Sequence, residues 1–264
     1  MSAAAEARLT ALDAVADTQP VSAELAADLF AVADAVASQP ALRRALTDPS
    51  TPDEARQALA EALLGSRIGA AGVAVVSQAA RVRWSGSGAF VDALERQGVR
   101  TLLRVAESDG ALDTLEDELF KVERLVDATP ALRSALADRQ APVEARQRLL
   151  GDLLTGKVLP ATRELALRAV VARKRTFDLT VESYLAAAAE LRARAVVTVT
   201  VARPLTAEQE SRMRVALTAQ VGRALTLRVV VDPHVLGGVR VAIGDEIIEG
   251  TVAGRLHDAR RKLV

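Results

Sequence analysis

The sequence predicts a mostly α-helical protein: two tandem six-helix-type bundles that share one helix, followed by a small α+β domain. Three observations indicate this fold class. Hydrophobic residues make up 50% of the chain but aromatic residues only 2%, which favours helices packed through alanine and leucine over a β sandwich. A long segment of the N-terminal half recurs 90 residues later. After Arg194 the composition changes to short β-branched runs, which are typical of strands.

The repeat is visible in two segments of equal length. PALRRALTDPSTPDEARQALAEALL begins at Pro40, and PALRSALADRQAPVEARQRLLGDLL begins at Pro130. They align without a gap at an offset of 90 residues, and self-similarity of this length indicates a duplicated structural unit. Because such a unit is too long for a solenoid repeat, we expect two copies of one helical bundle. Copy one covers residues 1–100 and copy two covers residues 90–194.

Apolar residues three or four positions apart predict the individual helices. In copy two, Leu115, Leu119, Val122 and Val126 form such a stripe. Further helices of copy two are expected over residues 131–137, 142–154, 161–173 and 180–194.

One helix belongs to both copies. Residues 93–107 match residues 3–17, which open copy one, while residues 90–104 match residues 180–194, which close copy two. A helix over about 89–108 should therefore close copy one and open copy two, and Gly98 inside it allows a bend. A shared helix would make the two copies one rigid rod, and no Pro/Gly/Ser-rich linker separates them.

Residues 195–264 predict the small α+β domain. A β-branched run over 195–202 is followed by a helix that Gly222 ends and by a second strand over 225–232. The stretch LGGVRVAIGDEIIEGTVAGRL, from Leu236 to Leu256, then reads as turn, strand, Gly244-Asp245 turn, strand and last helix. We expect the hinge to the helical region near residues 193–196.

Composition excludes several classes of protein. Lys+Arg and Asp+Glu number 34 each, so the chain lacks the basic surface of a general nucleic-acid binder. It has no cysteine, which excludes disulfides, zinc-thiolate sites and thiol catalysis. The N-terminal residues show no basic region followed by an apolar core, so we expect no secretory signal. The longest uncharged run, residues 68–80, is too short to span a bilayer. We expect no nucleic-acid partner and no transmembrane segment.

The sequence contains no catalytic constellation. His234 and His257 have no metal-ligand spacing, and the nucleophile-elbow, phosphate-loop and dinucleotide motifs are absent. The Gly237-Gly238 pair precedes a strand, so a tight turn is a better interpretation than an anion site. We therefore expect no enzyme activity, cofactor or metal. Trp84 lies at a helix end and is equally compatible with the core and with a partner contact.

The C-terminal residues resemble the signature of the delta subunit of bacterial F-type ATP synthases, a family that includes the mitochondrial oligomycin-sensitivity-conferring protein. The resemblance is carried by Asp232, Leu236, Gly237, Gly238, Ile243, Gly244, Asp245, Ile248, Glu249, Gly250, Thr251, Val252 and Leu256. The family usually has Asp-x-Ser or Asn-x-Ser where this chain has Glu249-Gly250-Thr251. The resemblance covers about residues 90–264, and the additional copy one is similar to the enlarged actinobacterial form.

This resemblance implies a non-catalytic stator component, one per complex, peripheral on the cytoplasmic face of the plasma membrane. The helical part would bind the N-terminal segment of an alpha subunit in the groove between the first and fifth helices of a bundle. We favour copy two, where the corresponding residues, each also a candidate for the core, are Leu102, Leu103, Ala106, Leu165, Ala169 and Ala172. The C-terminal domain would hold the C-terminal end of the b-subunit stalk, with candidate contacts at Val239, Val241, Ile243 and Ile248.

Two functions from other classes stay open. The first is a helical adaptor or scaffold unrelated to ATP synthase. The second is a small-molecule enzyme that uses the Gly237-Gly238 turn, which the missing catalytic residues disfavour.

Overall fold

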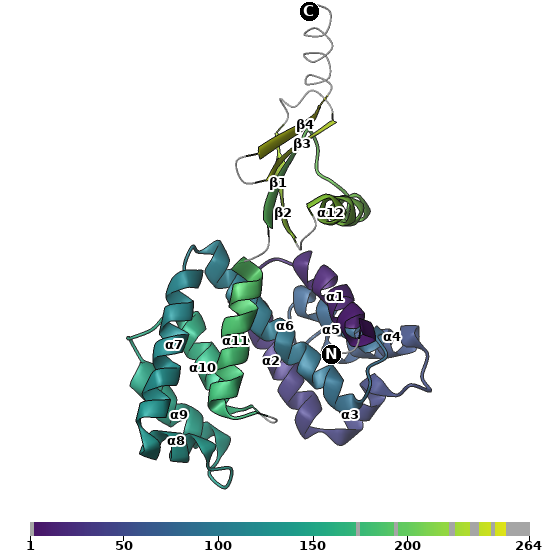
Figure 1. The fold of residues 1–264 in the computed structure, drawn as a ribbon. Coiled ribbons are helices and arrows are strands. Elements are labelled where there is room, and N and C mark those ends of the chain that lie inside the picture. Colours follow the sequence, from purple (N-terminus) through teal and green to yellow (C-terminus); the bar gives the residue numbers. More distant parts are fainter. Residues whose placement is uncertain are drawn as a thin grey trace, which may run out of the picture. The chain divides into compact units, whose positions relative to one another are not determined.

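The computed structural model describes residues 3–172, 175–192, 195–221, 225–232, 238–243 and 246–251. The chain divides into two compact units, a helical unit of residues 1–189 and a C-terminal unit of residues 190–264 (Figure 1). The prediction of a mostly helical chain with a small sheet near the C-terminus is confirmed.

The helical unit is built around one long helix, α6 (Ser87–Ser108). Five helices precede it: α1 (Ala3–Asp17), α2 (Ala23–Ser38), α3 (Pro40–Thr47), α4 (Asp53–Leu64) and α5 (Ala70–Arg81). Five follow it: α7 (Leu112–Ala128), α8 (Pro130–Ala137), α9 (Val143–Leu154), α10 (Pro160–Val170) and α11 (Phe177–Arg192). In Figure 1, α6 runs between the two groups.

The helix bounds keep the spacing of the sequence repeat. α3 and α8 have eight residues each, α4 and α9 have twelve each, and each pair begins 90 positions apart. The helices expected in copy two lie within a few residues of those observed, although α10 ends at Val170 rather than near 173.

Local sequence explains where several helices begin. Ser22 caps α2 by accepting a hydrogen bond from the Leu25 amide at 3.1 Å. Proline occupies the first turn of α3, α8 and α10, where no intrahelical amide bond is lost. Gly110 and Gly156 take the left-handed backbone that ends α6 and follows α9.

α6 forms part of the core on nearly all of its sides. Its apolar residues include Phe90, Leu94, Leu102 and Leu103, all at most 3% exposed. It contacts α1, α2, α3, α5, α7 and α10, so it belongs to the packing of both helical groups. A second cluster, with Val122, Leu150 and Ala166, fills the interior among α7 to α10.

The C-terminal unit contains a four-stranded sheet of order β2-β1-β3-β4. Its strands are β1 (Ala195–Val201), β2 (Leu225–Val231), β3 (Gly238–Ile243) and β4 (Glu246–Thr251). β1 pairs parallel with β2 and antiparallel with β3, and β3 and β4 form a hairpin. The expected last helix, after Thr251, lies outside the described residues.

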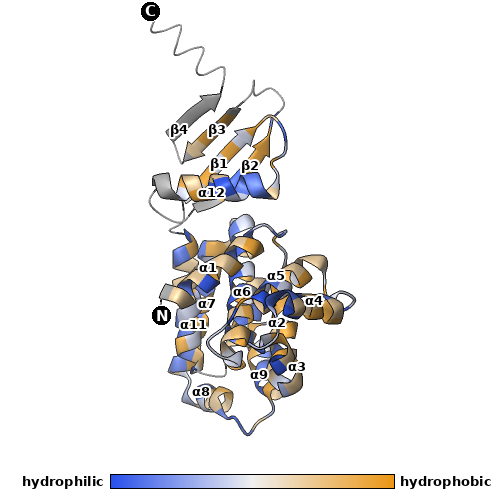
Figure 2. Cartoon of the chain, turned by 90° about the vertical axis from the view of Figure 1, so that its right-hand side faces the viewer, coloured by the Kyte–Doolittle hydropathy of each residue, from blue (hydrophilic) through white to orange (hydrophobic). Residues whose placement is uncertain are grey.

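Helix α12 (Ala207–Val221) crosses over between the parallel strands β1 and β2, as a parallel connection requires. Val197, Val199 and Val201 of β1 alternate onto one face and pack with Leu217 of α12. Figure 2 shows β1, β2 and β3 mostly in the hydrophobic colour and hydrophilic residues on the visible side of α12.

No single described helix has the length and apolar composition of a membrane span. The pair α2 and α3 reaches that composition only together, and the two helices are bent by 108° at the break between them.

Candidate docking surfaces

Of the six residues predicted to bind an alpha-subunit helix, three lie on α6, two lie on α10, and Ala172 follows α10, but most are not on the surface. Leu102, Leu103, Ala106, Leu165 and Ala169 are at most 3% exposed, and Ala172 is half-buried. In the chain as folded, five of the six therefore pack in the core of the helical unit.

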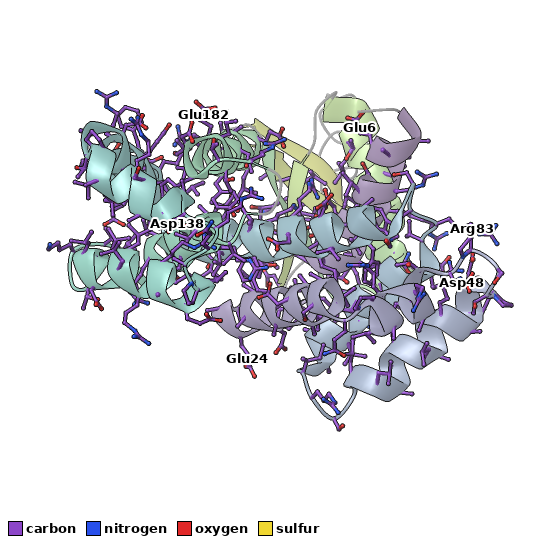
Figure 3. The ribbon with its side chains drawn as sticks, turned by 90° about the horizontal axis from the view of Figure 1, so that it is seen from below. Glu6, Glu24, Asp48, Arg83, Asp138 and Glu182 are labelled. Carbon is purple, nitrogen blue, oxygen red and sulfur yellow. The ribbon has the colours of Figure 1, made fainter. Side chains whose placement is uncertain are left out.

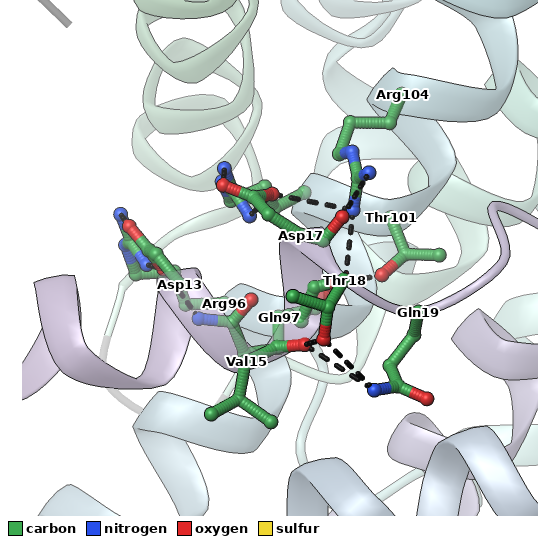
Figure 4. A network of polar contacts seen from close by, with 11 residues as sticks. Asp13, Val15, Asp17, Thr18, Gln19, Arg96, Gln97, Thr101 and Arg104 are labelled. Carbon is green, nitrogen blue, oxygen red and sulfur yellow. Dashed lines mark hydrogen bonds and ion pairs between the residues drawn. The ribbon is translucent and has the colours of Figure 1, made fainter. Parts of the chain in front are cut away.

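The residues on α6 are buried because this helix packs against α1 as well as against α10. Asp13 of α1 receives hydrogen bonds from Arg96 and Gln97 (Figure 4). Asp17 pairs with Arg100 at 2.7 Å. Burial opposes the charge of Asp13, but the hydrogen bonds and the nearby arginines outweigh it and lower the pKa of this carboxyl. The acidic side of α1 and the basic side of α6 are thus complementary.

A second polar junction joins copy one to copy two. Arg168 of α10, 5% exposed, donates to both carboxylate oxygens of Asp34 in α2, at 2.6 and 2.9 Å. Its Nε donates to Glu95 of α6 at 3.1 Å, and a further bond joins the same two side chains. The guanidinium also lies over the Phe30 ring, 4.8 Å from its centroid. We call these four residues the Arg168 junction.

The carboxylates of the Arg168 junction stabilise the positive charge of the buried arginine. Burial disfavours the charge of Arg168, but the bonds to Asp34 and Glu95 outweigh it and raise its pKa further above the ordinary arginine value. Beside it, burial and the charge of Glu95 raise the pKa of Tyr184 in α11. Both groups therefore keep one protonation state throughout the physiological range.

Gly98 has a different role from the bend that the sequence suggests. A Cβ atom at this position would lie 2.5 Å from the Phe30 ring, so only glycine allows α2 to approach α6 this closely. α6 is a single helix from Ser87 to Ser108.

Sequence reasoning did not identify the Arg168 junction. Its residues come from α2, α6 and α10, and the contact between Arg168 and Asp34 spans 134 positions. The repeat offers one signal: the equivalents of Asp34 and Arg168 in the other copy are Arg124 and Gln78, so these positions differ in charge between the copies.

The predicted stalk contacts lie on β3 and β4. Val239 and Val241 are half-buried and pack against the cluster beneath α12. Backbone pairing places Ile248 opposite Val241, and Ile243 opposite Val197. The side chains of Ile243 and Ile248 lie outside the described part of the structure. The adjacent Arg240 is exposed, on the same strand.

The family-signature residues are described in part. The Asp232 amide donates to the Val201 carbonyl at 2.9 Å, which ties the end of β2 to β1. Gly238 pairs with Thr251, and Glu249 pairs with Arg240, within the hairpin. Leu236, Gly237, Gly244 and Asp245 lie outside the described residues. The expected strand-turn-strand unit is present, because β3 and β4 are joined by two residues.

Comparison with known proteins adds an independent finding. The family model described as ATP synthase delta (OSCP) subunit matches residues 98–263. A protein of Streptomyces avermitilis named ATP synthase subunit delta is 43% identical over 254 residues, covering 96% of this chain and 93% of that protein. Proteins of the same name from Beutenbergia cavernae and Cutibacterium acnes are 42% and 40% identical, each over 96% of both chains.

Proposed function

The chain belongs to the ATP synthase delta (OSCP) subunit family, and from this premise we propose how it connects the parts of the complex. It is a non-catalytic subunit of the peripheral stalk of the F-type ATP synthase, associated with the membrane-bound complex. We propose that its helical unit binds an alpha subunit of the catalytic head and that its C-terminal unit binds the b-subunit stalk, at the cytoplasmic face of the membrane.

The observation that carries this proposal is the extent of the family match. It begins inside α6, continues through α7 to α11 and includes the sheet of the C-terminal unit. A helical adaptor unrelated to ATP synthase is not favoured, because similarity to named delta subunits also covers copy one.

We also propose that copy one and copy two are duplicates that share α6. The equal lengths of α3 and α8 and of α4 and α9 support this, as does the 90-residue offset. Because α6 is enclosed and Arg168 bonds to α2, the helical unit would transmit force as one body. A tether that resists the torque of the rotating shaft needs this rigidity.

For the alpha subunit, we propose docking on copy two, against α10 and the end of α6. Leu165 and Ala169 are buried, so the partner helix would contact their more accessible neighbours. These include the exposed Glu164 and the half-buried Ala172. An amphipathic helix that packs into a groove is a common mode of such recognition.

Matched substitutions in the two copies test this choice. Ala74 and Glu164 occupy equivalent positions, 90 residues apart, on α5 and α10. We expect Glu164→Arg to weaken binding of a synthetic alpha-subunit N-terminal peptide to the full chain, and Ala74→Arg to leave it unchanged. The opposite result would assign docking to copy one.

For the stalk, we propose that the β3–β4 hairpin contacts the b subunit, around Val239, Val241, Ile243 and Ile248. Family resemblance and the half-buried state of the first two residues support this. Deletion of residues 232–264 should abolish b-subunit co-purification and spare alpha binding. The deletion also removes β3, which pairs with β1, so its effect on binding is combined with damage to the sheet. The point variant Arg240→Glu, at an exposed position of β3, tests the contact while all the strands are kept.

The overall function is tested in membranes depleted of their own delta subunit. Adding the chain should restore ATP-driven proton pumping without changing the ATP hydrolysis rate of the detached head. Binding of the chain without recovery of pumping would contradict the coupling role.

A further inference from the structure

Copy one contains an open cleft that no part of the proposed stator function uses. It has a volume of about 460 Å³ and lies between the end of α3, the α3–α4 loop and the segment before α6. Its lining includes Arg44, Asp48, Arg56, Arg83 and Trp84. All the lining residues precede residue 98, where the family match begins.

A buried arginine holds the walls of the cleft together. Arg56 is 1% exposed and donates to the carbonyl oxygens of Asp48 and Thr51 on one side, at 3.2 and 2.5 Å. On the other side it donates to the carbonyls at the end of α5, those of Ala80 and Arg81, at 2.7 and 2.9 Å. Its donors are therefore occupied, and its effect is to fix the shape of the cleft in advance of any ligand.

Two other arginines present their charge to the cleft. Arg44, in the last turn of α3, is exposed, and its side chain makes no hydrogen bond or ion pair with any residue that the structure describes. The Arg83 side chain is 65% exposed, and its one ion pair, with Asp53, is 3.4 Å long. Figure 3 shows Arg83 near Asp48 at the edge of copy one.

Asp48 is the one acidic residue of this lining, and its Oδ1 is already engaged. Asp48 accepts hydrogen bonds from the Ser50 amide at 2.8 Å and the Ser50 hydroxyl at 2.7 Å, and these bonds lower its pKa. Against this carboxylate stand the guanidinium of Arg44 and the part of the Arg83 guanidinium that does not bond to Asp53. A surplus of positively charged donors matches a ligand rich in carboxylate oxygens.

Trp84 adds an aromatic surface of fixed orientation. Its Nε1 donates to the Ala79 carbonyl at 2.9 Å, and the half-buried indole packs against the copy-one core while it also lines the cleft. Such an anchored indole can receive an apolar side chain or the stem of a charged one. The cleft therefore offers both charged donors and an apolar surface. A small inorganic anion would use the donors but not the apolar surface.

The same combination is absent from the sequence of copy two. The positions equivalent to Arg44 and Trp84 are Ser134 and Lys174. The features are thus specific to the additional bundle.

We propose that this cleft binds an acidic segment of a neighbouring protein, with Arg44 and Arg83 holding its carboxylates and Trp84 receiving an adjacent apolar side chain. The cleft gives copy one a docking role of its own, separate from the binding of the alpha subunit on copy two. This inference does not depend on the stator function, because its test needs no other subunit.

Trp84 is the only tryptophan of the chain, so its fluorescence reports directly on the cleft. The full chain is titrated with an acetylated and amidated Glu-Leu-Glu-Glu-Leu-Glu peptide, followed by tryptophan emission and by calorimetry. The same peptide with glutamine in place of glutamate, and inorganic phosphate, are the comparison ligands. Arg44→Ser removes the free charge and introduces the residue of copy two, and Arg67→Ser removes an exposed arginine outside the cleft lining.

We expect saturable binding of the acidic peptide that weakens as salt is added, and no binding of the glutamine peptide. Arg44→Ser should weaken the acidic peptide about tenfold, the loss of one charge-assisted hydrogen bond, and Arg67→Ser should not. Unchanged melting temperatures will show that both variants fold.

Three results would overturn the proposal. The first is no binding of the acidic peptide by either method, whether or not phosphate binds. The second is equal binding of the glutamine peptide. The third is equal affinity of Arg44→Ser and the unmodified chain, which would place the peptide elsewhere.

Discussion

Arg168→Gln is the substitution that should most weaken the helical unit as a rigid tether. It removes the cation of the Arg168 junction and leaves the carboxylates of Asp34 and Glu95 facing each other. Breaking a buried pair by removing one partner costs about 3–5 kcal/mol. Since the Asp34 side chain is 47% exposed and solvent screens its charge, we expect the lower end, about 3 kcal/mol.

Thermal and urea unfolding of the full chain measure this loss. For a unit of this size, about 3 kcal/mol lowers the melting temperature by about 6–12 °C. Hydrogen exchange should quicken in α2 and α10, the helices that Arg168 joins. Arg133→Gln, which removes an exposed arginine on α8, is the control and should leave stability unchanged.

A combined variant distinguishes two causes of this stability loss, namely the excess negative charge left by the removal of Arg168 and the loss of packing. Changing Asp34→Asn and Glu95→Gln together with Arg168→Gln also removes the negative charges of both carboxylates and should recover at least half of the loss. A loss under about 1 kcal/mol for Arg168→Gln alone would refute the reasoning, because it would mean that the junction contributes no more than a surface ion pair.

Three further substitutions test other contacts of the helical unit. Gly98→Ala should cost about 1–3 kcal/mol in urea unfolding, because its methyl group would overlap the Phe30 ring. Arg56→Met should lower stability by at least about 3 kcal/mol, since it leaves four carbonyl oxygens without their hydrogen-bond donor. The loss should exceed that of Arg146→Met, because Arg146 donates to two carbonyl oxygens. Asp13→Asn should lower the melting temperature at neutral pH. Because the folded state lowers the pKa of Asp13, its stabilisation is present above pH 3.8 and is lost as the pH falls below that value, so the difference should vanish in acid.

Each of these has its own control or contrary outcome. Gly86→Ala places a methyl group in open space and should be neutral, so equal losses at both glycines would count against the steric account. Equal losses at Arg56 and Arg146 would show that carbonyl satisfaction does not decide their contribution. A difference for Asp13→Asn that persists in acid would attribute its effect to packing instead of charge.

The sequence predicted the features that depend on local periodicity. The repeated apolar spacing located α8 and α9 nearly to the residue, and the two overlapping matches indicated the helix that became α6. The Gly-Asp break predicted the β3–β4 hairpin for the same reason, because two residues suffice to reverse a strand.

Features that depend on long-range packing were not predictable in this way. An apolar stripe identifies the buried side of a helix, but it does not say whether another helix of the chain or a partner covers it. Leu102 and Leu165 therefore fitted both a docking groove and the core, and the structure places them in the core. The burial of Arg168 was not predictable from its neighbours in the sequence, since its partners lie in distant helices.

The central claim is that the helical unit contacts the alpha subunit and the C-terminal unit contacts the b subunit. Because the chain has no cysteine, single-cysteine variants carry one photoactivatable cross-linker each in the assembled complex. Glu164→Cys on α10 and Arg240→Cys on β3 place it at exposed positions of the two units. The account predicts cross-links from the first variant to the alpha subunit and from the second to the b subunit. Cross-links of both variants to one subunit, or the reverse pairing, would contradict it.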